Sequence, residues 1–123
     1  MEVTITSGLK PSTVETIRDQ LEFQRNFHPR WFAYHFPAIA SRGTSVEYSE
    51  VESMTEREMG SVRQLLINQI IYHRKRIAGR KARAITFLGD NQPDSDDEWT
   101  IRLTQLEEAL RDFCAVNGFV SPL

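Results

Sequence analysis

The amino-acid sequence predicts a mainly α-helical protein with three principal helices, and one short signal that occurs three times is the first reason. The pattern Ser-x-x-Glu begins at Ser12, Ser53 and Ser95. A serine followed at this spacing by a glutamate can satisfy the free backbone amides at the start of a helix. The second reason is that apolar residues at helical spacing follow each signal. The predicted helices cover about residues 13–27, 54–78 and 96–117.

The first predicted helix has two apolar faces. One face carries Val14, Ile17 and Leu21. Phe23 and Phe27 lie nearly opposite to it. The helix should end at His28, because the residue before a proline disfavours helical geometry. Two apolar faces imply two packing neighbours.

The second predicted helix is the longest and the most apolar. Its stripe consists of Met59, Val62, Leu66, Ile70, His73 and Ile77, and Leu65, Ile67 and Ile71 widen it. At ~1.5 Å per residue this helix would be roughly 36 Å long, about the diameter of a compact chain of this size. Gly79 is predicted to end it. We expect this central helix to be covered by the weaker segments or by a second copy of the chain, which predicts a homo-oligomer, most simply a two-fold dimer.

The third predicted helix has a single narrow apolar face, typical of a surface helix that packs from one side. The face is formed by Trp99, Leu103, Leu106, Leu110, Phe113 and Cys114. Gly118 should end the helix with a residue in the left-handed conformation. Cys114 continues the apolar face, so we expect a buried, inert thiol.

Three short stretches with strand-like alternation or composition lie outside these helices. They cover about residues 2–6, 45–49 and 84–88, and they make an α+β fold the alternative. The segment 30–43 is irregular, and it can form either a short helix with Pro29 in its first turn or an extended loop.

Length and composition indicate one soluble domain over residues 1–123. The sequence is 40% apolar and 26% charged, which is unlike a disordered chain. A net charge of −2 argues against a whole surface devoted to nucleic acid or to an anionic membrane. There is one cysteine, no secretory pattern in the first ten residues, and no apolar run that could span a bilayer. We therefore expect a cytoplasmic protein that does not act at a membrane.

An aromatic-rich segment is the strongest functional signal. Half of the aromatic residues lie between Phe23 and Phe36. Aromatic and arginine side chains are typical anchors of protein interfaces. This pattern predicts a non-enzymatic interaction module of the assembly, adaptor or inhibitor type, although core packing explains the same residues. The candidate partner-binding residues are Phe27, Arg30, Trp31, Phe32, Tyr34 and Phe36.

A basic segment supports an alternative function, the binding of nucleic acid. Its cations are Arg74, Lys75, Arg76, Arg80, Lys81 and Arg83. Clustered cations can neutralise phosphates and release counterions. The competing interpretation is a solvated helix end that complements the helix dipole.

No pattern in the sequence predicts catalysis. The acidic residues 90–98 lack the glycine and the distal glutamate of a calcium loop, and their position favours a helix start. His28 and His35 lack partners at zinc-site spacing, and His73 on the apolar stripe favours a hydrogen-bonded core histidine. We therefore predict no catalytic residue, no metal and no cofactor. A small enzyme whose site converges only in space is the third alternative.

Overall fold

A computed structural model of the chain describes residues 4–5, 8–88 and 96–123, with side chains over 8–79 and 98–123. This part of the chain is mainly helical, as the sequence predicts. The elements in chain order are β1 (Thr4–Ile5), α1 (Pro11–Phe27), α2 (Pro29–His35), α3 (Pro37–Arg42), α4 (Tyr48–Val51), β2 (Ser53–Met54), α5 (Glu56–Leu88) and α6 (Asp96–Asn117).

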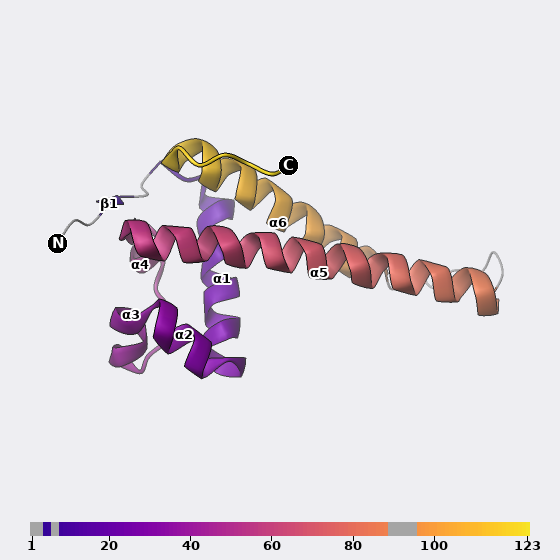
Figure 1. The fold of residues 1–123 in the computed structure, drawn as a ribbon, viewed down its shortest axis with the longest axis horizontal. Helices are drawn as coiled ribbons and strands as arrows, with labels where there is room; N and C mark the ends of the chain where they lie inside the picture. Colours follow the sequence, from indigo (N-terminus) through magenta and orange to yellow (C-terminus); the bar gives the residue numbers. More distant parts are fainter. Residues whose placement is uncertain (1–3, 6–7, 89–95) are drawn as a thin grey trace.

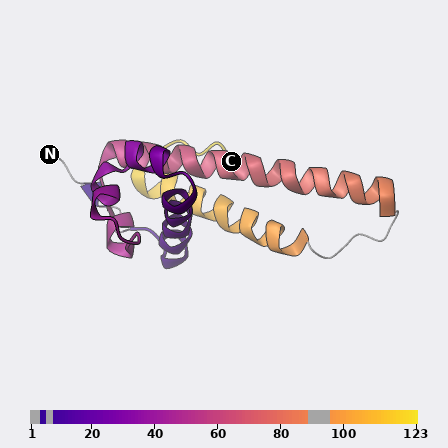
Figure 2. The same cartoon turned by 90° about the horizontal axis from the view of Figure 1, so that it is seen from below.

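Helices α5 and α6 form an antiparallel hairpin, which is the longest part of the molecule (Figure 1). Helix α1 crosses this hairpin and packs against α6, while α2 packs against both α1 and α5. The last turns of α5 extend beyond the first residue of α6 (Figure 2). Helix α1 thus lies across the direction of the hairpin (Figure 1).

The core joins all of these helices. Helix α5 buries its predicted stripe, with Met59, Val62, Leu66, Ile70, His73 and Ile77 all at most 8% exposed. From α1 come Ile17 and Leu21, and from α6 come Leu106, Leu110 and Phe113. Helix α2 adds Phe32, and Phe36 follows it. The irregular segment after residue 29 is thus resolved in favour of short helices, with Pro29 at the first position of α2.

Two of the three predicted strands are wrong. Residues 45–47 form no regular element and Tyr48–Val51 form the short helix α4, and residues 84–88 belong to α5. At this length a few alternating residues do not distinguish a strand from a loop or a helix turn. The predicted strand at 2–6 is present as Thr4–Ile5, which pairs antiparallel with Met54 and Ser53.

The predicted end of the second helix at Gly79 is also wrong, because α5 continues to Leu88 and has 33 residues. A glycine inside a helix costs only about 1 kcal/mol, which good helix formers on both sides can offset. At ~1.5 Å per residue α5 is roughly 50 Å long. Gly118, in contrast, ends α6 as predicted, with a φ of 76° and a 2.9 Å hydrogen bond from the Phe119 amide to the Cys114 carbonyl.

The predicted capping residues need correction at two helix starts. Lys10 is the N-cap of α1 and Pro11 its first residue, so Ser12 lies inside the helix. Ser53 pairs with Ile5 in β2. The reciprocal capping bonds are made instead by Thr55 and Glu58, at 2.9 Å and 3.2 Å. The third signal, at Ser95, lies outside the described residues, and α6 begins at Asp96.

Candidate functional site

The structure divides the aromatic segment between core and surface. Phe32 is 1% exposed and Phe36 is 0% exposed, so neither presents a side chain to a partner. Phe27 and Tyr34 are each 67% exposed. The candidate residues that reach the surface are Phe27, Arg30, Trp31 and Tyr34, with Trp31 half-buried. We call these four residues, the last residue of α1 and three residues of α2, the α2 surface.

Contacts with α5 support two residues of the α2 surface, Trp31 and Tyr34. The Trp31 ring lies against the His35 ring, with 4.4 Å between their centroids. The Nδ1 atom of His35 is 3.0 Å from the Ser61 hydroxyl of α5. The guanidinium of Arg57, also on α5, lies 5.6 Å from the centre of the Tyr34 ring, within cation–π range. Tyr34 is therefore exposed but supported by an arginine.

A second feature is a cavity of about 440 Å³ lined by α1, α5 and α6. Its volume is typical of sites for small ligands. Four rings line it: Phe23 from α1, Tyr72 and His73 from α5, and Trp99 from α6. The His73 and Trp99 ring centroids are 4.9 Å apart, and those of Tyr72 and Trp99 are 6.2 Å apart. Rings from all three helices therefore form part of the cavity wall.

His73 is the buried polar group of this cavity. It is 6% exposed, and its Nδ1 atom lies 2.7 Å from the Gln69 backbone oxygen. A carbonyl only accepts hydrogen bonds, so Nδ1 carries the proton, and in the neutral ring Nε2 is an acceptor. Among the described residues no hydrogen bond to Nε2 is found. The sequence predicted a hydrogen-bonded core histidine, and this is confirmed, but the cavity beside it was missed.

Amides and charges complete the cavity. Gln20, Gln69 and Gln105 line it, one from each of the three helices. Asp19 and Arg102 stand at exposed positions among the lining residues. Arg102 is paired with Glu98 at 3.1 Å. The cavity thus offers hydrogen-bond donors and acceptors beside its four rings.

One residue of the predicted basic segment, Arg76, contacts the wall of this cavity. Arg74 pairs with Glu107 of α6 at 2.5 Å. Lys75 and Arg76 are exposed, and neither pairs with a carboxylate among the residues whose side chains are described. The Arg76 guanidinium is 5.0 Å from the centre of the Trp99 ring. The side chains of Arg80, Lys81 and Arg83 lie outside the described ones. The prediction that these residues bind nucleic acid therefore rests on the sequence alone.

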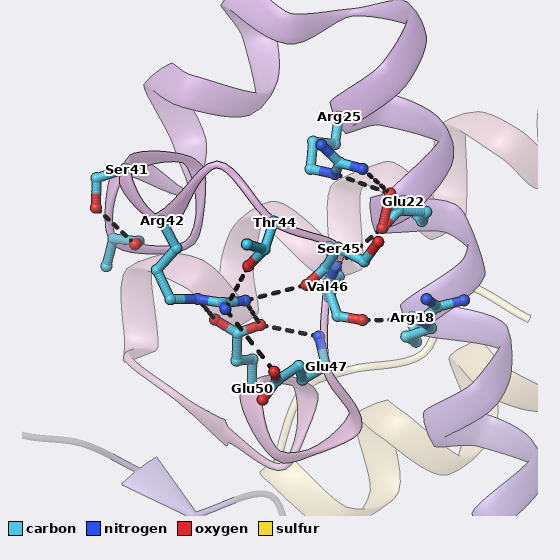
Figure 3. Close-up of polar contacts among 11 residues, drawn as sticks. Arg18, Glu22, Arg25, Ser41, Arg42, Thr44, Ser45, Val46, Glu47 and Glu50 are labelled. Atoms are coloured by element: carbon cyan, nitrogen blue, oxygen red, sulfur yellow. Dashed lines mark hydrogen bonds and ion pairs between the residues drawn. The ribbon is translucent and has the colours of Figure 1, made fainter.

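A polar clamp fixes the loop between α3 and α4 onto α1 (Figure 3). The Val46 amide donates to Glu22 at 2.9 Å, and the Val46 carbonyl accepts from Arg18 at 2.9 Å. Arg25 also donates to Glu22, at 2.8 Å. Burial alone would raise the pKa of the Glu22 carboxyl, but these bonds and the charges of Arg25 and Arg18 hold that pKa below its usual value.

Arg42 forms a second polar cluster at the same loop (Figure 3). Its guanidinium donates to Glu50 at 2.8 Å, to the Thr44 hydroxyl at 2.6 Å and to the Ser45 carbonyl at 3.1 Å. Glu50 in turn accepts from the Glu47 amide at 2.8 Å. These bonds join the end of α3 to the loop and to α4, so we interpret the charges as structural.

Cys114 is buried, as the sequence predicts. Burial raises the pKa of its thiol, and the nearby Arg63 opposes this only in part. A thiol with a raised pKa holds less of the reactive thiolate at neutral pH. A buried thiol with a raised pKa is a poor nucleophile at neutral pH.

No protein-family model, curated protein or solved structure matches this chain. Within the described residues no group of three or more His, Cys, Asp or Glu side chains is arranged to hold a metal ion. In the same part of the chain no helix has the length and apolar character needed to cross a membrane.

The sequence did not reveal the cavity residues as a group. Gln20, Gln69 and Gln105 belong to no sequence motif, and Trp99 and His73 belong to apolar stripes. The pairing of Tyr72 with Trp99 does have a signal in the sequence. Tyr72 is adjacent to the buried stripe of α5, and Trp99 begins the stripe of α6, so an antiparallel α5–α6 pair brings the two rings together.

Proposed function

We propose that this protein is a non-enzymatic interaction module, of the assembly, adaptor or inhibitor type, which binds another protein through the α2 surface. The observation that supports this most is the 67% exposure of both Phe27 and Tyr34. Phe32 and Phe36 from the same segment are fully buried. The segment therefore supplies enough aromatic side chains for the core and still leaves two of them in water.

The composition of the α2 surface supports the same proposal. Tryptophan, tyrosine and arginine are the residues that most often dominate binding energy at protein interfaces. Arg30, Trp31 and Tyr34 fit this pattern, and Arg57 stands beside Tyr34. Aromatic side chains lose little rotamer entropy on binding, so they give large contact area at low cost.

The simplest partner is a second copy of the chain. A two-fold interface brings the same patch of both subunits together. The α2 surface carries both halves of a cation–π pair, because Arg30 of one copy can face Tyr34 of the other. We therefore propose a homodimer as the first assembly to test.

Light scattering coupled to size-exclusion chromatography tests the dimer. The wild-type chain should show twice the monomer mass of 14.2 kDa at micromolar concentration. The double variant Phe27→Ser, Tyr34→Ser should return to the monomer mass, because it removes the two exposed anchors. Val120→Ser is the matched control, since Val120 is 81% exposed outside the α2 surface. A wild-type monomer at every concentration would show that the partner is not a second copy.

In that case a photo-crosslinking amino acid at position 34 tests the surface itself. A single specific adduct that the Phe27→Ser variant loses would support a different protein as the partner. The same amino acid at position 120 is the control. Adducts of equal pattern at both positions, or none at all, would contradict the interaction proposal.

A further inference from the structure

The cavity between α1, α5 and α6 has a lining that no apolar ligand would satisfy. Its rings favour a flat, stackable group. Its polar groups, the amides of Gln20, Gln69 and Gln105 and the Nε2 atom of His73, need hydrogen-bond partners once water is displaced. A planar heteroaromatic ring with donors and acceptors on its edge meets both demands.

Positive charge beside the cavity indicates a second property of the ligand, a negative charge. Arg76 lies over Trp99, and Lys75 is its exposed neighbour. The carboxylates facing this region are Asp19 on the lining, Glu98 on Arg102 and Glu107 on Arg74. Glu98 and Glu107 are each bound to an arginine. Arg76, which contacts the cavity wall at Trp99, therefore remains for an anion among the residues whose side chains are described. A phosphate joined to the heteroaromatic ring would use this cation.

We propose that this cavity binds a nucleobase that carries a phosphate. The base stacks on the Trp99 ring, its edge donates a hydrogen bond to Nε2 of His73, and Arg76 neutralises the phosphate. Two sources share this chemistry, a free nucleotide and a residue of a single-stranded nucleic acid. The volume of about 440 Å³ leaves room for one nucleotide. This site is separate from the α2 surface, and its test is independent of the interaction proposal.

Nuclear magnetic resonance of the full chain provides the direct test. The protein has two tryptophans, and Trp31→Phe identifies which indole N–H signal belongs to Trp99. The four ribonucleoside monophosphates are the probes for a free nucleotide, and short unstructured homopolymers of single-stranded DNA and RNA are the probes for a strand. Ribose 5-phosphate is the control without a base. We expect the base-containing probes to shift the Trp99 signal and to leave Trp31 unmoved, whereas ribose 5-phosphate should shift neither.

The probes that shift the Trp99 signal identify the source of the base. Shifts with mononucleotides assign a nucleotide site, and shifts with homopolymers alone assign a strand; both outcomes support the base-binding cavity. No shift of Trp99 with any probe at millimolar concentration would overturn the proposal. Equal shifts with ribose 5-phosphate would overturn it as well, because phosphate alone would then account for binding.

Calorimetry on variants locates the binding. Trp99→Ala should weaken the affinity about tenfold or more, since one stacking platform is lost. His73→Phe keeps a ring but removes the acceptor, and it should weaken the affinity about threefold to tenfold. Ile101→Ala is the control on α6, because Ile101 is exposed and does not line the cavity. Binding that is the same in Trp99→Ala, His73→Phe and Ile101→Ala would place it on the basic segment instead and refute the cavity.

Discussion

Truncation of Phe36 to alanine should be one of the most damaging single changes in this chain. Phe36 is 0% exposed, and its ring is 5.5 Å from Phe32 and 6.1 Å from Trp31, centroid to centroid. Phe-to-Ala changes in a core cost about 3–5 kcal/mol, because apolar area is lost and a cavity remains. A chain of this length has a free energy of unfolding of roughly 6–18 kcal/mol. With an m-value of about 2 kcal/mol per M, the urea midpoint should fall by about 2 M.

Urea unfolding followed by circular dichroism measures this effect, and Tyr34→Ala is the matched control. Tyr34 comes from the same segment but is 67% exposed, so its truncation should change the free energy of unfolding by less than about 1 kcal/mol. The comparison separates core aromatic residues from those of the α2 surface. The reasoning fails if Tyr34→Ala costs as much as Phe36→Ala, since the aromatic segment would then be core throughout and the interaction proposal would lose its surface.

Three further predictions concern the glycines, the caps and the clamp. Gly60→Ala should stabilise α5 by about 0.5–1 kcal/mol, because an added methyl group meets no atom within 4 Å. Gly118→Ala should destabilise the end of α6 by about 1–2 kcal/mol, because the φ of +76° disfavours a side chain. Thermal melts of the two variants compare these effects. Thr55→Ala should cost about 1 kcal/mol by the same assay, and an equal loss from Ser53→Ala would argue for the cap that the sequence predicted. The lowered pKa of Glu22 means that its carboxylate stabilises the fold above the unfolded-state pKa and that this contribution is lost as the pH falls through the folded-state value. Glu22→Gln should therefore be less stable than wild type at pH 7, and in urea titrations the difference should shrink in acid; a constant difference across pH would contradict the clamp.

The helices and their buried faces could be predicted because they depend on periodicity. The stripe from Met59 to Ile77 repeats at helical spacing, and every member of it is buried. The extent of α6 and its end at Gly118 followed from an apolar face and a glycine. Such patterns are local in sequence, and burial of one face of a helix follows from them directly.

Element starts were predicted less well because two neighbouring signals competed. Residues 53–58 contain two overlapping capping patterns, one from Ser53 and one from Thr55. The pairing of Ser53 with Ile5 removes the first from consideration, and that contact is not visible in the local sequence. At α1, Pro11 already has the backbone geometry of a first helical residue, so the helix begins before Ser12.

The cavity could not be predicted because its members are far apart in the sequence. Phe23, His73 and Trp99 come from three helices, and only the packing of α1 and α5 against α6 brings them together. Each residue has an ordinary interpretation as part of an apolar face. The same holds for the clamp, in which Glu22 meets a backbone amide of a distant loop. Polar residues show no periodicity from which such a contact could be predicted.

The two apolar faces of α1 connect the fold to both proposals. The sequence predicted two packing neighbours for this helix. The face with Ile17 and Leu21 is buried in the core, whereas Phe23 is 46% exposed and Phe27 is 67% exposed, with their ring centroids 4.7 Å apart. Phe23 lines the cavity and Phe27 belongs to the α2 surface, so this second face spans both candidate sites. The two neighbours predicted for α1 are present as α2 and α6. The exposed rings of the second face are therefore left for the two candidate sites, and Phe27→Ser and Trp99→Ala test these sites separately.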